Sequence, residues 1–73
     1  MKSKRTMGKR KLNRIKEVLD TKGIKYSWLA YQMGKSLPTM SNWVNNLKQP
    51  SLDQVVTMAE ILEVPPLELV SLG

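Results

Sequence analysis

The side chains best suited to chemistry in this sequence are short and uncharged, and they gather between residues 36 and 46. Asn42 carries an amide that both donates and accepts hydrogen bonds, and Thr39 carries a hydroxyl beside a methyl group. Because positions three apart lie on one face of a helix, these two side chains would share an exposed helical face. Such a face supports recognition of a partner by hydrogen bonding, not the making or breaking of bonds.

Residue types that metal binding and catalysis usually need are absent or scattered. The chain has no cysteine and no histidine, which excludes a disulfide scaffold and a thiolate or imidazole metal site. Its six acidic residues form no paired cluster, so we expect no enzymatic activity and no cofactor. No apolar run could span a membrane, and no secretory signal follows the basic N-terminus. We therefore expect a cytoplasmic protein without a membrane partner, and nothing indicates a small-molecule ligand.

Positive charge is concentrated at the N-terminus. The net charge of +6 arises from residues 1–16, which hold eight basic residues and no acid, whereas the remainder holds four basic and six acidic residues. We predict a flexible basic arm over residues 1–8 and one small domain over residues 9–73. An arm of this charge predicts a polyanionic partner, DNA or RNA, although a basic tail can also serve solubility alone.

The spacing of apolar residues predicts five helices and no strand, and therefore an all-α fold. The expected helices run from about residue 9 or 11 to 21, over 26–33, over 37–45, from 51 onward, and from 66 to about 72. Gly23 and Gly34 would end the first two helices in a left-handed conformation. Ser36 would cap the third helix, and Ser51 and Gln54 make a capping box for the fourth.

Apolar residues at helical spacing predict a mostly aliphatic core. They are Leu12, Ile15, Val18 and Leu19 in the first helix, Leu29, Ala30 and Met33 in the second, Met40 and Trp43 in the third, and Leu52, Val55, Val56, Ala59 and Leu62 in the fourth.

The second and third predicted helices, joined by a turn at Gly34, have the layout of a helix-turn-helix. The segment LAYQMGKSLPTMSNWVNNLKQPSLDQVVTMAEILEV resembles the phage-repressor and Cro-type helix-turn-helix family, also called Xre-like. The residues that carry the resemblance are Leu29, Ala30, Gly34, Met40, Trp43, Pro50, Ser51, Leu52, Ala59, Leu62 and Val64. The resemblance covers about residues 12–70 and implies a compact five-helix, lambda-repressor-like domain.

This resemblance implies sequence-specific binding of double-stranded DNA by a transcriptional regulator, most often a repressor. Such a protein would be encoded by a bacterium or phage and associated with the nucleoid. The helix over 37–45 would read the major groove, and by position the residues that reach base edges are Leu37, Pro38, Thr39, Ser41 and Asn42. The Asn42 amide can pair with N6 and N7 of adenine, and this face has no Arg or Lys to read guanine. We therefore expect a preference for A·T pairs.

Residues that flank the helix pair would contact phosphates, which positions the protein without reading sequence. We expect these residues to be Lys25, Tyr26, Lys35, Ser36, Asn45, Asn46 and Lys48. The basic residues of the arm would follow the phosphate backbone or enter a minor groove; they are Lys2, Lys4, Arg5, Lys9 and Arg10.

Several positions depart from the family pattern. Lys35 stands where an apolar residue, often Val, is usual, and its stem could cover the edge of the core. Leu19 and Val44 stand where the family often pairs an Arg with a Glu, so apolar contact would replace an ion pair. Asn46 replaces a glycine and is the next-best residue for a left-handed turn. Lys25 is a poor N-cap for the second helix.

Two other functions fit the sequence. A protein-interaction module, such as an antitoxin, would dock through exposed Leu37 and the apolar C-terminal stretch, and an RNA-binding protein would use the basic arm. The apolar stretch could instead form a homodimer contact or complete the core of the monomer; its residues are Pro66, Leu67, Leu69, Val70 and Leu72. Symmetric binding to an inverted repeat is what the family resemblance implies.

Overall fold

The computed structural model describes residues 11–71. Within them lie four α-helices, α1 (Ile15–Lys22), α2 (Tyr26–Met33), α3 (Leu37–Val44) and α4 (Leu52–Leu62), and one 3-10 turn, η2 (Pro66–Leu69). The all-α fold class is confirmed, and α2 has the predicted bounds. No helix within residues 11–71 is long and apolar enough to cross a membrane. Two predicted features lie outside the described residues, namely Leu72 and the arm with Lys2, Lys4, Arg5, Lys9 and Arg10.

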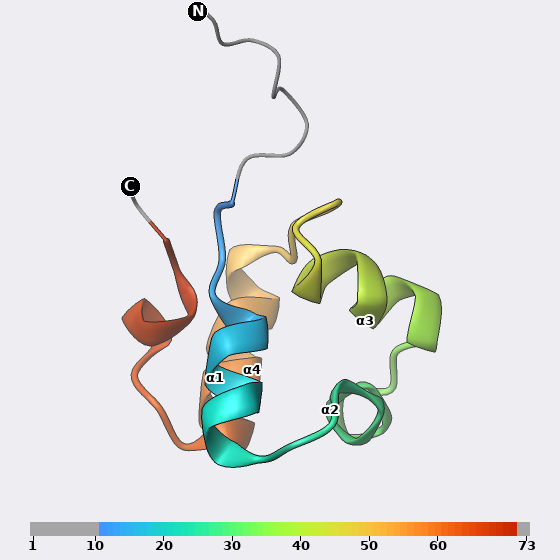
Figure 1. Ribbon diagram of the computed structural model, residues 1–73, viewed down its shortest axis with the longest axis horizontal. Helices are drawn as coiled ribbons and strands as arrows, with labels where there is room; N and C mark the ends of the chain where they lie inside the picture. Colours follow the sequence, from blue (N-terminus) through green and yellow to red (C-terminus); the bar gives the residue numbers. More distant parts are fainter. Residues whose placement is uncertain (1–10, 72–73) are drawn as a thin grey trace, which may run out of the picture.

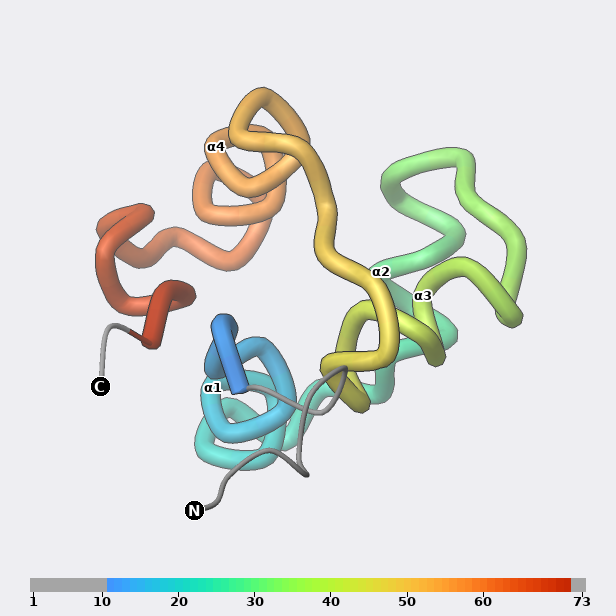
Figure 2. Tube along the Cα trace, turned by 90° about the horizontal axis from the view of Figure 1, so that it is seen from above, coloured from blue at the N-terminus to red at the C-terminus, as the bar shows by residue number. Residues whose placement is uncertain are grey.

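The helices surround one apolar core. In Figure 1, α1 and α4 run upright, α2 is seen along its axis and α3 lies across the picture; Figure 2 looks along α1 and α4 and separates them. The turn η2 packs against α4 and α1, on the side of the core away from α2 and α3. The buried side chains that fill the core are Ile15, Val18, Leu19, Leu29, Ala30, Met40, Trp43, Val44, Val55, Met58, Ala59, Leu62 and Leu69.

Each α-helix is followed by a residue in the left-handed conformation. The residues with positive φ within 11–71 are Gly23 (69°), Gly34 (66°), Asn46 (59°) and Glu63 (60°). In every case the N–H of the next residue donates to the carbonyl five residues back, which satisfies one free carbonyl at the helix end. The predicted turns at Gly23, Gly34 and Asn46 are confirmed, whereas the sequence pattern does not indicate the one at Glu63.

Replacement of Glu63 by glycine should stabilise the fold. A residue with a Cβ costs about 1–2 kcal/mol in the left-handed region, and the greater freedom of glycine in the unfolded chain offsets part of the gain. We expect Glu63→Gly to raise the free energy of unfolding by about 0.5–1 kcal/mol, as measured by urea denaturation.

The matched control is Glu63→Gln, which keeps the strained backbone and removes only a negative charge beside the negative end of the α4 dipole. This change should raise the free energy of unfolding by only about 0.3 kcal/mol. Equal stabilisation by the two variants would mean that the charge, and not the backbone conformation, is unfavourable at this position.

The first helix begins later than predicted, because the residues before it pair with the end of the chain. Asn13 and Val70 form an isolated antiparallel bridge, and the Arg14 N–H donates to the Leu69 carbonyl at 2.9 Å. Backbone groups committed to this pairing cannot join a helix. Leu12 is consequently 41% exposed, not part of the core. The same pairing ends η2 after one turn, so the predicted fifth helix is a single 3-10 turn that begins at Pro66, and the count of five helices is not confirmed.

The predicted start of α4 is confirmed, but its buried face differs from the prediction. The Ser51 Oγ accepts from the Gln54 N–H at 3.2 Å, and the Gln54 Oε1 accepts from the Ser51 N–H at 2.8 Å. Leu52 (77% exposed) and Val56 (39% exposed) were wrongly expected in the core, whereas Met58 is fully buried. Leu52 is the first residue of α4, where the helix extends beyond the core. Val56 lies about 100° around the helix from buried Val55 and therefore faces away from the core. The buried face comprises Val55, Met58, Ala59 and Leu62.

Candidate functional site

The site is built on the crossing of α2 and α3, which are joined by the turn at Gly34. In Figure 1 α2 is seen end-on and α3 runs sideways above it, and the two helices pack directly on each other. Ala30 is 2% exposed, and its small side chain permits the close approach of the helices. The predicted inner face of the pair is confirmed: Leu29, Ala30, Met40 and Trp43 are buried, and Met33 is partly buried against the core.

The opposite face of α3 is polar and partly accessible. Ser36 caps the helix as predicted, because its Oγ accepts from the Thr39 N–H at 3.2 Å and donates to the Thr39 Oγ1 at 3.0 Å. Leu37 is 53% exposed at the first helical position. Within residues 11–71 the Asn42 side chain makes no hydrogen bond, so its amide can serve an external partner. Of the remaining predicted base-contacting residues, Pro38 is exposed, whereas Thr39 and Ser41 are partly buried, as Asn42 is.

A surface depression beside this face gathers three of the predicted phosphate-contacting residues. Lys25 and Tyr26, at the start of α2, line it together with Asn45, which follows α3. Lys16, its ion-pair partner Asp20, and Ser27 also line it, although the sequence pattern does not mark them. The helix α2 begins without a side-chain cap, as the prediction for Lys25 requires, so N–H groups of its first turn remain open to an anion.

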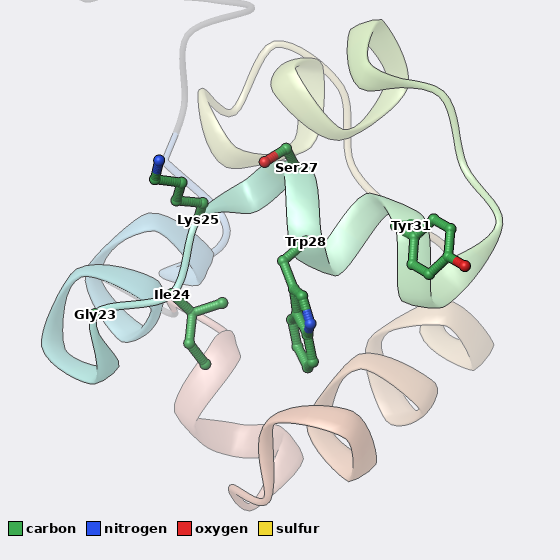
Figure 3. A pocket seen from close by; sticks show the side chains of 6 residues that line it. All are labelled: Gly23, Ile24, Lys25, Ser27, Trp28 and Tyr31. Carbon is green, nitrogen blue, oxygen red and sulfur yellow. The ribbon is translucent and has the colours of Figure 1, made fainter.

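The two sides of α2 differ in character. Figure 3 shows Lys25 and Ser27 pointing to one side of the helix, whereas Ile24 and Trp28 point to the other. A second groove along α2 is lined by Ile24 and Trp28 and also by Lys25 and Ser27, and Tyr31 points away from the helix at its rim. Trp28 is 45% exposed and Tyr31 is 81% exposed, so neither aromatic ring belongs to the core.

The other predicted phosphate-contacting residues occupy different environments. Lys35 is partly buried directly after the turn, which agrees with the prediction that its stem covers the edge of the core. Lys48 is exposed in the loop after α3, and Ser36 is exposed at the cap. The Asn46 side chain is engaged inside the protein, because its Oδ1 accepts from two backbone N–H groups of the N-terminal segment. Because the Asn46 side chain is used inside the protein, we assign it no phosphate contact.

The contact between α1 and α3 is apolar where the family often has an ion pair. Leu19 is 3% exposed and Val44 is 6% exposed, and both belong to the core. The predicted replacement of the ion pair by apolar contact is therefore confirmed. Such a replacement avoids the desolvation of two charges and need not lower stability.

Asn13 is a site residue that the sequence analysis missed. Asn13 is only 4% exposed, and among residues 11–71 it is the polar residue that is buried. Its Nδ2 donates to the Trp43 carbonyl at 2.9 Å. Its Oδ1 accepts from the Ile15 N–H at 3.1 Å at the start of α1. The available signal was the preference of Asn for positions just before a helix, where its side chain accepts from backbone N–H groups.

Charge is divided between two parts of the chain. After Lys48 the sequence has no basic residue, whereas α4 and the segment that follows it carry four exposed acids, Asp53, Glu60, Glu63 and Glu68. A polyanion is therefore repelled from α4 and attracted to the helices α2 and α3 and their flanking lysines. No three acidic side chains of residues 11–71 lie together in a way that could hold a metal ion.

Comparisons with known proteins agree with this geometry. A family model described as a Cro/C1-type HTH DNA-binding domain matches residues 14–72. The chain is 53% identical to a protein of known crystal structure, described as a "putative DNA-binding protein" from Bacteroides fragilis, with a TM-score of 0.81. The match covers 82% of this chain and 97% of that chain. No curated protein matches the sequence.

Proposed function

The chain belongs to the Cro/C1-type helix-turn-helix DNA-binding family, and from this premise we propose that it represses transcription by reading an operator in the major groove with α3. The observation that carries the proposal is the orientation of α3. Met40 and Trp43 fix one side of the helix in the core, which leaves the amide of Asn42, without a hydrogen bond to any residue of 11–71, on the side that DNA would approach. Exposed Leu37 at the start of the helix offers an apolar contact for a thymine methyl group.

Phosphate contacts would hold α3 in place on the duplex. The depression between the start of α2 and the end of α3 supplies Lys25, Tyr26 and Asn45 on one side of the recognition helix. The turn before α3 adds Lys35 and Ser36, and the loop after it adds Lys48. We assign these residues to positioning, because phosphate contacts carry no sequence information.

Asn42→Ala should remove recognition of one A·T base pair. A bidentate contact between an amide and adenine discriminates by about 1–3 kcal/mol, so affinity for the preferred duplex should fall about 5- to 150-fold. Affinity for a shuffled duplex should not change, because that duplex offers no matching adenine. Fluorescence anisotropy titrations with both duplexes measure the two affinities.

Lys48→Ala is the matched control for a phosphate contact. This substitution should weaken binding to both duplexes equally. It should also lower the steepness of log K against log salt by about 0.9. If Asn42→Ala also lowered affinity for both duplexes equally, Asn42 would not be reading a base.

Selection of bound sequences from a random duplex pool tests the proposed function as a whole. We expect an enriched motif with a bias toward A·T pairs, and only weak competition by a structured RNA. Enrichment of no motif, or preferential binding of the RNA, would contradict sequence-specific DNA reading.

We also propose that two copies bind symmetrically to an inverted repeat. Leu69 is fully buried and Val70 packs against the core, so these residues complete the monomer, whereas Leu67 is 77% exposed and offers an apolar contact surface. Sedimentation of the protein with the selected duplex gives the number of copies bound. A single copy on a motif without a repeat would contradict the symmetric pair.

A further inference from the structure

A cluster of three amide side chains, which we call the amide clamp (Asn13, Asn46 and Gln49), ties the N-terminal segment to the end of α3. Asn46 holds the backbone of this segment, because its Oδ1 accepts from the N–H of Leu12 at 2.8 Å and from that of Asn13 at 3.0 Å. The Asn46 Nδ2 donates to the Asn13 carbonyl at 3.2 Å. One side chain thus pairs with the backbone of two residues, as a neighbouring strand would.

Asn13 provides the return contacts of the amide clamp. Its Nδ2 donates to the Trp43 carbonyl at 2.9 Å and to the Gln49 Oε1 at 2.7 Å. Gln49 in turn donates from its Nε2 to the Asn46 Oδ1 at 3.1 Å. Asn13 is buried, and a buried amide that has its hydrogen-bond partners holds one arrangement, since displacement would leave a polar group unpaired. The backbone at residues 12–13 therefore has a fixed place beside the end of α3.

The turn after α3 does not itself require the side chain of Asn46. Glycine is the residue best suited to a left-handed turn at a helix end, and Gly23 and Gly34 fill the equivalent positions after α1 and α2. Among the described residues, the Asn46 side chain forms hydrogen bonds with Leu12, Asn13 and Gln49. What asparagine adds over glycine at this position is therefore the attachment of the N-terminal segment.

We propose that Asn46 is a positioning residue, which directs the basic N-terminal segment onto DNA beside the C-terminal end of α3. This inference rests on the proposed function. The amide clamp makes the segment begin next to Asn45 and Lys48, two of the proposed phosphate contacts, and Figure 2 shows its first described residues near the chain that follows α3. The sequence before Leu12 contains no acid and six basic residues: Lys2, Lys4, Arg5, Lys9, Arg10 and Lys11.

The distribution of charge explains why such a device is useful. The four exposed acids of α4 and its following segment would attract an unattached basic segment to the protein itself. Lys11 already pairs with Glu17 of α1. The amide clamp fixes residues 12–13 beside the end of α3. We propose that the basic residues before them are thereby directed to DNA and not to the protein's own acids.

The test combines Asn46→Gly, which keeps the left-handed turn, with an arm-neutral chain in which the five basic residues of the arm are replaced by glutamine. Binding to the duplex is titrated at several salt concentrations for four chains, which have the natural or the neutral arm, each with and without Asn46→Gly. With the natural arm, Asn46→Gly should weaken binding about tenfold near 0.1 M salt and lower the steepness of log K against log salt by about 0.9, the equivalent of one phosphate contact. With the neutral arm, the same substitution should change affinity by less than about twofold.

Hydrogen exchange separates the loss of the amide clamp from loss of the fold. In Asn46→Gly the amides of Leu12 and Asn13 should lose protection, while those of the core helices keep it. Gln49→Ala is a second variant, which weakens the amide clamp without touching the turn, and it should show the same dependence on the arm at a smaller size.

The outcomes discriminate between the two proposals. Equal losses of affinity with both arms would mean that Asn46 acts through α3 or by its own phosphate contact, and no loss with either arm would mean that the amide clamp does not position the segment. Either result overturns the inference while DNA binding stands. Failure of the unsubstituted chain to bind any duplex would overturn the proposed function and the inference with it.

Discussion

Trp43→Ala should unfold the protein or bring it close to unfolding. Trp43 is 6% exposed and anchors α3 in the core. Truncation of a buried tryptophan to alanine costs about 3–5 kcal/mol. A small domain has a free energy of unfolding of only about 5 kcal/mol, so little stability would remain. Urea denaturation followed by circular dichroism measures the loss.

Trp28→Ala is the matched control, since it removes the same side chain from α2. Trp28 is 45% exposed, so its removal should lower the free energy of unfolding by only about 1 kcal/mol. A loss for Trp43→Ala no larger than this would contradict the assignment of Trp43 as the anchor of α3. With that anchor removed, the orientation on which the proposed DNA reading depends would have no support.

The helix-turn-helix was predictable because its determinants are local. Ser36 caps α3 through a residue three positions on, Gly34 makes the preceding turn, and Met40 and Trp43 lie one helical turn apart on the buried face. Each of these relations spans at most a few residues, so the pattern of the sequence contains it directly. The same reasoning correctly marks Asn46 as a left-handed residue.

Features that depend on contacts between distant parts of the chain were not predictable in this way. Asn13 lies in a stretch with helical spacing, but its partners Trp43 and Asn46 are thirty or more positions away, and its hydrogen bonds to them keep it out of the helix. Lys16 likewise joins the depression beside Asn45 only through the packing of α1 on α3. Helical periodicity carries no information on such partners, which is why the site residues on α1 and before it were missed.

The affinity of the protein for DNA should fall steeply with salt. If the arm and the flanking residues neutralise about six phosphates, log K should fall against log salt with a slope near −5, which is about a thousandfold between 50 and 200 mM salt. The domain alone cannot supply this attraction easily, because residues after position 16 carry four basic and six acidic side chains. The basic residues of the first sixteen positions should therefore dominate the slope.

The arm-neutral chain tests this division between arm and domain. Each lost phosphate contact lowers the steepness by about 0.9, so loss of two or three arm contacts should leave a slope of about −2 to −3. The selected motif should not change, because phosphate contacts carry no sequence information. An unchanged slope would mean that the arm serves solubility alone and that the domain makes all the phosphate contacts. A changed motif would instead place the arm in a minor groove, where it reads the width and base composition of the duplex.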